Sequence, residues 1–173
     1  MKYLKGTKDL KLCVGSKSDL KLKGYADADW PGDIKDRKST SGFVFKLGDA
    51  AISYASRKQQ NVTLSSTEAE FVSLAEVSQE FLCLIQLLKK FQINICDPII
   101  FEDNQSCLKM LQEEKITPRS KHIDVKYYFV RNLLKTGKVL YEYCPTESML
   151  ADILTKPLPR IRIYKIRELI GLY

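Results

Sequence analysis

The stretch LSSTEAEFVSLAEVSQEFLCLIQLLKKF, residues 64–91, decides the fold class because its apolar residues recur at intervals of three and four. This spacing places them on one side of a helix, so the sequence predicts a long amphipathic helix here. The Ser-Ser-Thr run at 65–67 offers caps for its start, and Lys89 and Lys90 complement the negative end of the helix dipole. We therefore expect one long helix that buries its apolar side.

Three strand-like runs precede this helix. Residues 20–26 alternate apolar and polar side chains, and two further runs cover residues 42–47 and 51–56. The Gly-Asp-Ala sequence between the last two runs suits a hairpin turn. We expect these runs to form an antiparallel meander that makes up the first part of a sheet.

The chain after the long helix alternates between the two kinds of element. The expected elements are a strand at 98–103, helices at 104–112 and 123–134, a strand at 138–144, a short helix at 147–156 and a tail helix at 160–173. This order predicts an α/β fold, a mixed sheet with helices on its faces. We expect a lead-in at 1–19, one domain at 20–158 and a basic C-terminal helix at 159–173.

The bulk composition narrows the classes of function. With 173 residues, 45% of them hydrophobic, the chain can bury the core of one domain. We find no apolar run of membrane-spanning length and no export signal, which predicts an intracellular protein that is neither secreted nor membrane-bound. The scattered cysteines are typical of reduced thiols. The net charge of +7, concentrated after residue 115, predicts a polyanionic partner such as nucleic acid.

Four carboxylates stand where strand ends and helix starts are expected to meet. Asp27 ends the first core strand of the prediction, and Asp103 ends the fourth. If these two strands run parallel and side by side, their carboxyl ends lie at one edge of the sheet. Glu70, in the first turns of the long helix, and Asp152, in the short helix, would then reach the same point.

A cluster of carboxylates is stable only when positive charge lies between them. Oxygen ligands of this kind select magnesium or manganese rather than zinc. Two such ions, about 3.5–4 Å apart, catalyse phosphoryl transfer, so the chemistry indicates a nuclease. The alternative interpretation is that each acid is a solvated strand end or helix cap. Asp29 and Asp33, which follow Asp27 closely, suit turn positions.

Five longer motifs carry a resemblance. They are, in chain order, YADADWPGDIKDRKSTSGFVF (25–45), SRKQQNVTLSSTEAEFVSLAE (56–76), EDNQSCLKM (102–110), SKHIDVKYYFVR (120–131) and PTESMLADILTKPLP (145–159). Together they resemble the ribonuclease H domain of copia-type LTR retrotransposon Pol polyproteins, over nearly the whole chain. The opening KYLKGT (2–7) resembles the segment that joins the reverse transcriptase to that domain.

The resemblance implies a ribonuclease H-like fold with a five-stranded mixed sheet, its first three strands antiparallel, flanked by helices. It also implies an endonuclease that cuts the RNA strand of RNA–DNA hybrids with two Mg²⁺ or Mn²⁺ ions, next to a reverse transcriptase domain. The catalytic residues and metal ligands would be Asp27, Glu70, Asp103 and Asp152. The alternatives are an inactive relic or coopted domain that binds nucleic acid or protein, and a different nuclease on the same fold.

Polar and basic residues near the predicted metal site are candidates for substrate binding. A hybrid is recognised through the 2′-hydroxyls of its RNA strand, and basic side chains grip phosphates. The expected nucleic-acid contacts are Ser66, Thr67, Asn104, Gln105, Lys58, Lys121 and His122, with Arg37, Lys38, Arg57 and Arg119 as further basic candidates. His122 equally suits a buried bond with Asp124. We expect Trp30 to pack in the core rather than to stack on a base.

Two features of the C-terminal part stand apart from these expectations. Many cellular ribonucleases H carry a histidine in the loop before the last catalytic aspartate, whereas this loop reads CPTES, residues 144–148. The tail helix at 160–173 has basic residues opposite apolar ones. We expect this helix to dock on its own domain or on a partner domain.

Overall fold

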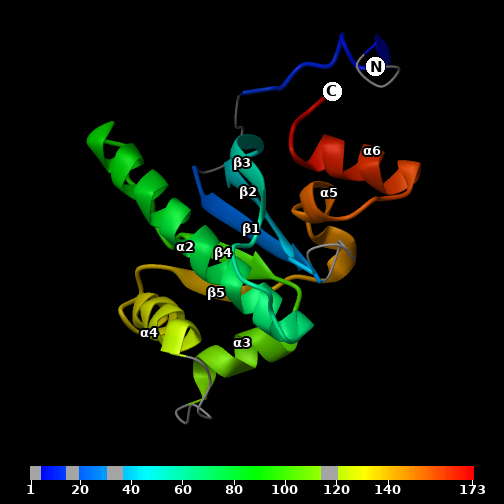
Figure 1. Ribbon diagram of the computed structural model, residues 1–173. Coiled ribbons are helices and arrows are strands. Elements are labelled where there is room, and N and C mark those ends of the chain that lie inside the picture. Colours follow the sequence, from blue (N-terminus) through cyan, green and yellow to red (C-terminus); the bar gives the residue numbers. More distant parts are fainter. Residues whose placement is uncertain (1–4, 15–19, 31–36, 114–120) are drawn as a thin grey trace.

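The computed structural model describes residues 5–14, 20–30, 37–113 and 121–173, with side chains from residue 125 onward in the last range. The strands are β1 Leu22–Asp29, β2 Thr40–Leu47, β3 Ala50–Lys58, β4 Ile99–Glu102 and β5 Leu140–Tyr143. The helices are α2 Ser66–Lys90, α3 Gln105–Gln112, α4 Lys121–Lys135, α5 Asp152–Thr155 and α6 Arg160–Leu169, with a 3₁₀ turn at Thr146–Ser148. Figure 1 shows α2 and α4 on one side of the sheet and α5 and α6 on the other.

The five strands form one sheet in the order β3-β2-β1-β4-β5. β1 pairs with β2 and β2 with β3 in antiparallel fashion, whereas β4 joins β1, and β5 joins β4, in parallel. The expected α/β fold, a mixed sheet whose first three strands are antiparallel, is therefore confirmed. Because β1 and β4 are parallel neighbours, their carboxyl ends lie at the same edge of the sheet.

Helix α2 forms the centre of one layer. The Ser65 hydroxyl accepts a hydrogen bond from the Glu68 main-chain nitrogen, 3.2 Å away, and so caps the helix. Phe71, Leu74 and Phe81 are fully buried in the core that α2 shares with the sheet, α3 and α4. By length and composition α2 is apolar enough to cross a membrane, so the expectation that the chain holds no such run is wrong. Here its apolar side chains pack against the sheet.

Helices α5 and α6 cover the opposite face of the sheet. Val44 of β2, Leu150 and Ile166 of α6 form a second buried cluster there. The tail helix thus packs on its own domain, one of its two expected positions. Beside it the segment around Lys11 pairs with the C-terminus, because the main-chain groups of Lys11 and Tyr173 exchange hydrogen bonds of 2.6 and 2.9 Å. Figure 1 shows this N-terminal segment close to the C-terminus.

Among the element boundaries that differ from the sequence expectation, three affect the acidic residues. β4 ends at Glu102, so Asp103 directly follows the strand instead of ending it. β1 continues to Asp29 because its pairing with β2 continues, so Asp27 lies inside the strand, opposite Gly42, rather than at its end. The expected helix at 147–156 divides into the 3₁₀ turn and α5, because Met149 between them has an extended backbone and is buried. Asp152 therefore opens α5 instead of lying in mid-helix.

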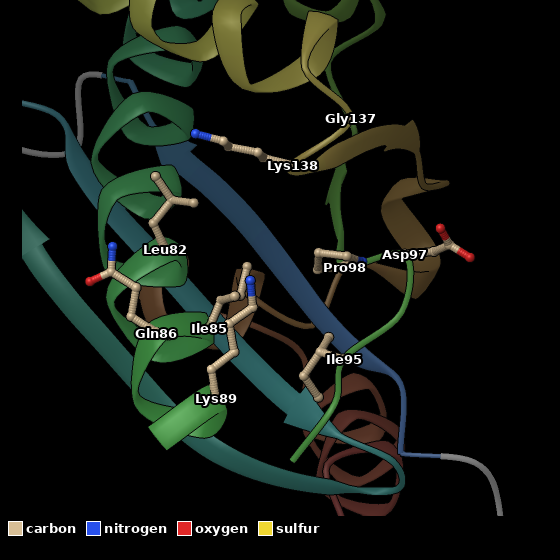
Figure 2. Close-up of a pocket in the computed structure, with 9 residues that line it drawn as sticks. All are labelled: Leu82, Ile85, Gln86, Lys89, Ile95, Asp97, Pro98, Gly137 and Lys138. Carbon is tan, nitrogen blue, oxygen red and sulfur yellow. The ribbon is translucent and has the colours of Figure 1, made fainter. Parts of the chain in front are cut away.

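A hollow of about 460 Å³ lies between the C-terminal half of α2 and the segments that lead into β4 and β5 (Figure 2). Ile85, Lys89, Ile95 and Lys138 are among its lining residues, and Asp97 is the sole carboxylate among them. These segments lie at the amino ends of β4 and β5, whereas Asp27 and Asp103 lie towards the carboxyl ends of β1 and β4. The hollow is therefore separate from the acidic residues.

Gly42 allows α5 to approach the sheet. A Cβ atom at this position would lie 2.7 Å from Thr155 Cγ2 and 3.1 Å from Leu154 Cβ, closer than side chains pack in protein interiors. Because Gly42 is paired with Asp27, this close approach also sets the distance between α5 and the acidic residue of β1.

We expect Gly42→Ala to lower the free energy of unfolding by about 1–3 kcal/mol, because the added methyl group pushes α5 away from β2. Denaturant titration of the two proteins measures the difference. Gly6→Ala is the matched control, since nothing lies within 4 Å of a Cβ built at that position. Equal stability of Gly42→Ala and the parent would contradict this account of how α5 is held.

Candidate active site

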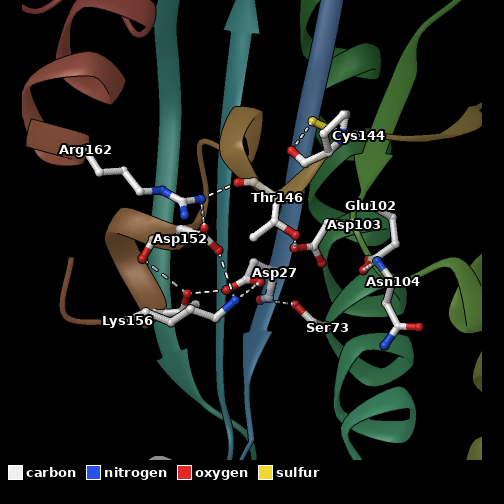
Figure 3. Close-up of polar contacts among 12 residues, drawn as sticks. Asp27, Ser73, Glu102, Asp103, Asn104, Cys144, Thr146, Asp152, Lys156 and Arg162 are labelled. Atoms are coloured by element: carbon white, nitrogen blue, oxygen red, sulfur yellow. Dashed lines mark hydrogen bonds and ion pairs between the residues drawn. The ribbon is translucent and has the colours of Figure 1, made fainter. Parts of the chain in front are cut away.

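Acidic side chains gather at the carboxyl ends of β1 and β4 (Figure 3). One carboxylate oxygen from each of Asp27, Asp103 and Asp152 lies within 4.8 Å of the others. A second group with the same spacing consists of Glu70, Glu102 and Asp103. Because Asp103 belongs to both groups, the four residues singled out from the sequence form one continuous cluster, and Glu102 extends it.

The strand pairing and one hydrogen bond bring these residues together. The parallel register of β1 and β4 places Asp27 beside the end of β4, which Asp103 follows directly. Helix α2 is tied to the same edge, because the Ser73 hydroxyl donates to the main-chain oxygen of Asp27 at 2.9 Å. Glu70 lies three residues before Ser73, on the same side of the helix, and therefore also faces this edge.

Side chains from the C-terminal segment bind two of the carboxylates. Lys156 Nζ lies 2.8 Å from Asp27 Oδ1 and 3.0 Å from Asp152 Oδ1. Arg162 of α6 pairs with Asp152 Oδ2, and the Thr155 hydroxyl donates to Asp27 Oδ2. Both aspartates are almost completely buried. These contacts supply the positive charge and the donors that buried carboxylates require.

Asp27 and Asp152 form one half of the cluster. Two groups there have shifted pKa values, the Asp152 carboxyl and the Lys156 ammonium. Burial raises the pKa of Asp152 and the charge of Asp27 raises it further, although Lys156 and Arg162 oppose both effects. Burial alone lowers the pKa of Lys156, but its contacts with Asp27 and Asp152 outweigh burial and raise that pKa above its ordinary value. Lys156 is therefore an ammonium ion at neutral pH, held between two acidic side chains.

Glu70 and Glu102 form the other half of the cluster, and neither has an ion-pair partner among the described residues. Glu70 and Glu102 are buried, and within the described parts of the chain neither Glu70 Oε2 nor Glu102 Oε2 has a hydrogen-bond partner. Burial raises the pKa of both carboxyl groups well above the ordinary range, and the charges of neighbouring carboxylates add to this effect. The hydrogen bond from the Asn104 main chain to Glu102 and the more distant charge of Lys156 oppose these effects without outweighing them, so the pKa values of both carboxyl groups stay raised.

The loop that lacks a histidine supplies a hydroxyl group to the cluster. The Thr146 hydroxyl donates to Asp103 Oδ2 at 2.8 Å. Arg162, which also binds Asp152, donates to the main-chain oxygen of Thr146 (Figure 3). The loop, the tail helix and two of the acidic residues are thus linked by direct contacts.

Four predicted substrate-binding residues flank the cluster along the chain. Ser66 is the exposed first residue of α2, and Thr67 beside it is half-buried. Asn104 caps α3, because its Oδ1 accepts from the Cys107 main-chain nitrogen at 3.0 Å. Gln105, the first residue of α3, is exposed. Capping by Asn104 occupies one of its oxygen lone pairs and leaves the amide NH₂ as a donor.

The basic candidates are more dispersed. Lys58 is exposed at the end of β3, and Arg57 beside it forms an ion pair of 2.8 Å with Glu80. Lys121 and His122 begin α4, but their side chains lie outside the described part of the chain, as do Asp33 and Arg119 entirely. Their roles stay predictions.

Trp30 differs from the expectation that it packs in the core. Its side chain is 42% exposed, and its Nε1 donates to the main-chain oxygen of Thr63 at 3.0 Å. It directly follows the carboxyl end of β1, where the chain leaves the sheet. The core assignment for Trp30 is wrong.

Sequence reasoning missed Glu102, Lys156 and Arg162. Glu102 had a signal, because Ile100 is buried in the core and residues two apart on a strand share a face. Lys156 lies four residues after Asp152, the spacing of an ion pair on a helix. Arg162 belongs to a helix whose docking position no local pattern specifies.

The donor set of the cluster consists of carboxylate oxygens, which hard divalent cations prefer over zinc. Asp27, Asp103 and Asp152 together are compatible with binding such an ion. Zinc or a thiolate site is disfavoured, since the five cysteines are free and Cys107 and Cys144 are buried thiols whose pKa values burial raises.

Comparison with known proteins shows which polyproteins the chain is similar to. No protein-family model matches the chain. Over 173 residues, 100% of the chain, it is 36% identical to the retrovirus-related Pol polyprotein from transposon TNT 1-94 of Nicotiana tabacum. Over 172 residues, 99% of the chain, it is 37% identical to the corresponding polyprotein from transposon RE2 of Arabidopsis thaliana. The chain spans 13% and 12% of the lengths of these relatives.

Solved structures share the fold at low sequence identity. The N-terminal ribonuclease H domain of a Mycobacterium tuberculosis protein has a TM-score of 0.57 at 14% identity, covering 87% of this chain and 98% of that domain. LC11 ribonuclease H1 in complex with an RNA/DNA hybrid has a TM-score of 0.58 at 14% identity, covering 78% of this chain and 94% of the enzyme. Along its whole length, therefore, the chain is a homologue of the Pol polyproteins of copia-type retrotransposons, and it has the ribonuclease H fold.

Proposed function

We propose that this chain is a divalent-metal-dependent nuclease that hydrolyses the RNA strand of RNA–DNA hybrids inside the cell, next to a reverse transcriptase domain. The observation that carries the proposal is the convergence of Asp27, Glu70, Asp103 and Asp152 at the carboxyl ends of two parallel strands of a ribonuclease H fold. Such a cluster in a basic protein suits hydrolysis of a polyanionic phosphodiester.

The residues present fit two divalent cations. The cluster offers oxygen ligands in two groups that share Asp103, and the buried Oε2 atom of Glu70 lacks a hydrogen-bond partner among the described residues. Asp27, Asp103 and Asp152 would hold one ion, and Glu70 with Asp103 would hold the other. Bound there, the ions would supply a nucleophile at neutral pH and stabilise negative charge on the phosphate oxygens.

Lys156 affects how a divalent cation would bind, because it already contacts two of the carboxylates. The Lys156 ammonium lies between Asp27 and Asp152, the two carboxylates that an incoming divalent ion would bind. A divalent cation and the ammonium ion repel each other at these carboxylates, so we expect binding of the cation to displace Lys156 from at least one of them. Released in this way, the ammonium group would be available to contact a phosphate of the substrate.

Polar groups around the cluster suit recognition of an RNA strand. Ser66 and Gln105 are exposed at the starts of α2 and α3, close in the chain to Glu70 and Asp103. Proteins identify RNA by hydrogen bonds to its 2′-hydroxyls in the shallow minor groove. Thr67 and Asn104, with Lys58, Lys121 and His122 as phosphate contacts, complete the proposed binding set.

Similar proteins support the choice of substrate and partner. LC11 ribonuclease H1 was solved in complex with an RNA/DNA hybrid, and so was the foamy viral protease-reverse transcriptase. The latter matches 85% of this chain with a TM-score of 0.54 at 16% identity. The Pol polyprotein relatives are consistent with a reverse transcriptase as the neighbouring domain.

A second candidate function is a nucleic-acid or protein binding module without catalysis. One observation favours it: Lys156 and Arg162 already neutralise Asp27 and Asp152, so the fold does not require a metal ion at these two residues. Cleavage and binding assays distinguish the two functions.

We expect the chain to cut the RNA strand of a labelled RNA–DNA hybrid in Mg²⁺ or Mn²⁺, and to leave duplex DNA and duplex RNA intact. Asp103→Asn should lower the cleavage rate at least about 100-fold, because Asp103 belongs to both carboxylate groups. Asp29→Asn, on the same strand as Asp27 but outside both groups, should retain the parental rate. A gel assay under single-turnover conditions measures all three.

Two results would contradict the nuclease proposal or its site. Salt-sensitive binding of the hybrid without any cleavage would favour the binding module instead. Undiminished cleavage by Asp103→Asn would remove the assignment of the catalytic residues.

We further expect Lys156→Met to lower the free energy of unfolding in EDTA by about 3 kcal/mol, because it leaves the buried Asp27 carboxylate without its cation and Asp152 with Arg162 alone. Added Mg²⁺ should restore much of this loss, and the variant should bind Mg²⁺ more tightly than the parent because the competing ammonium is gone. Thermal unfolding and calorimetric titration measure the two effects.

Lys126→Met is the matched control for this variant. The Lys126 side chain is 31% exposed, against 30% for Lys156, and it also makes an ion pair, with Glu76 at 3.1 Å. Because Glu76 is exposed, this variant should cost less than about 1 kcal/mol and leave Mg²⁺ affinity unchanged. Weaker Mg²⁺ binding by Lys156→Met would show that the ammonium does not compete with the metal ion.

A further inference from the structure

Glu102, the last residue of β4, is a buried carboxyl group outside the set that the sequence singled out. Its side chain is 0% exposed. Oε1 accepts a hydrogen bond from the Asn104 main-chain nitrogen at 3.1 Å, whereas Oε2 has no hydrogen-bond partner among the described residues. A buried polar atom without a partner costs free energy, so this oxygen calls for a proton or a cation.

The surroundings of Glu102 are acidic on the side of the cluster. Oxygens of Glu102, Glu70 and Asp103 lie within 4.8 Å of one another, and Glu70 Oε2 is also buried without a partner. On α3 the Cys107 thiol is fully buried, and burial and then the charges of Glu102 and Glu70 raise its pKa. Two buried carboxyl groups that each have one unpartnered oxygen therefore lie next to each other and to Asp103.

The contrast with the other half of the cluster is informative. Asp27 and Asp152 receive Lys156 and Arg162 as ion-pair partners. In the described ranges no basic side chain forms an ion pair or hydrogen bond with Glu70 or Glu102. Among the described residues, therefore, only one half of the cluster has basic ion-pair partners, and the other half calls for a proton or a cation.

We propose that Glu102 is a further metal ligand, which together with Glu70 and Asp103 holds one of two divalent cations of the Mg²⁺ or Mn²⁺ class. The inference rests on the proposed function, because it concerns the same site. It adds a fifth carboxylate to the cluster and accounts for the unpartnered Oε2 atoms of Glu70 and Glu102. An all-oxygen site with three carboxylates suits a hard cation.

Calorimetric titration of the whole chain with Mn²⁺ tests the proposal. The parent should bind two ions. Glu102→Gln, which keeps the acceptor for Asn104, should lose one ion or bind it at least about tenfold more weakly, as should Glu70→Gln. Glu142→Gln is the control, because Glu142 is exposed on β5 directly beside β4. It should bind both ions with parental affinity.

Each result either supports or overturns the assignment. Parental stoichiometry and affinity in Glu102→Gln would overturn it and leave the proposed nuclease intact, with Glu102 a protonated structural residue. A parent that binds no Mn²⁺ would overturn both. Thermal unfolding in EDTA checks that Glu102→Gln folds. If it does not, Glu102→Asp replaces it, since this variant keeps the charge but withdraws the oxygens by one methylene. Weakened binding then supports the assignment, and parental binding overturns it.

Discussion

The mutual repulsion of five carboxyl groups at one edge of the sheet is the constraint on which the rest of the site depends. Asp27, Glu70, Glu102, Asp103 and Asp152 come from elements far apart in the sequence. The parallel pairing of β1 with β4 forces three of them together, and the packing of α2 and α5 on opposite faces of the sheet brings the other two. Burial first, and then the charges of neighbouring carboxylates, raise the pKa values of Glu70, Glu102 and Asp152.

The C-terminal segment relieves part of this repulsion. Lys156 and Arg162 bind the two aspartates on the α5 side of the sheet, and the side-chain space left by Gly42 lets α5 come close enough to do so. Helix α6 is therefore part of the site, because its Arg162 side chain donates to Asp152 and to the main-chain oxygen of Thr146. The basic excess of the chain is thus partly internal and only partly a surface for polyanions.

Sequence patterns predicted the elements well where period and burial agree, as in α2, whose apolar residues face the sheet. The four carboxylates were located because strand ends and helix starts converge in such a sheet. Lys156 and Arg162 were missed because their partners depend on how the C-terminal helices pack on the sheet. Trp30 was misplaced because aromatic character alone does not show that a residue lies beyond the end of a strand. The nucleic-acid contacts at Lys121 and His122 stay predictions, as does the division into lead-in, domain and tail helix.

The two halves of the cluster differ in how the fold supports them. At Asp27 and Asp152 the chain supplies its own positive charge. At Glu70 and Glu102 the apolar packing of α2, through residues such as Phe71 and Leu74, has to hold the acids together. In so apolar a surrounding, an unpaired charge is more costly than it is next to water. Burial of acids without basic partners lowers the stability of the cation-free fold, a cost that functional sites commonly carry. A cation bound as proposed would therefore be coupled to folding more strongly at Glu70 and Glu102 than at Asp27 and Asp152.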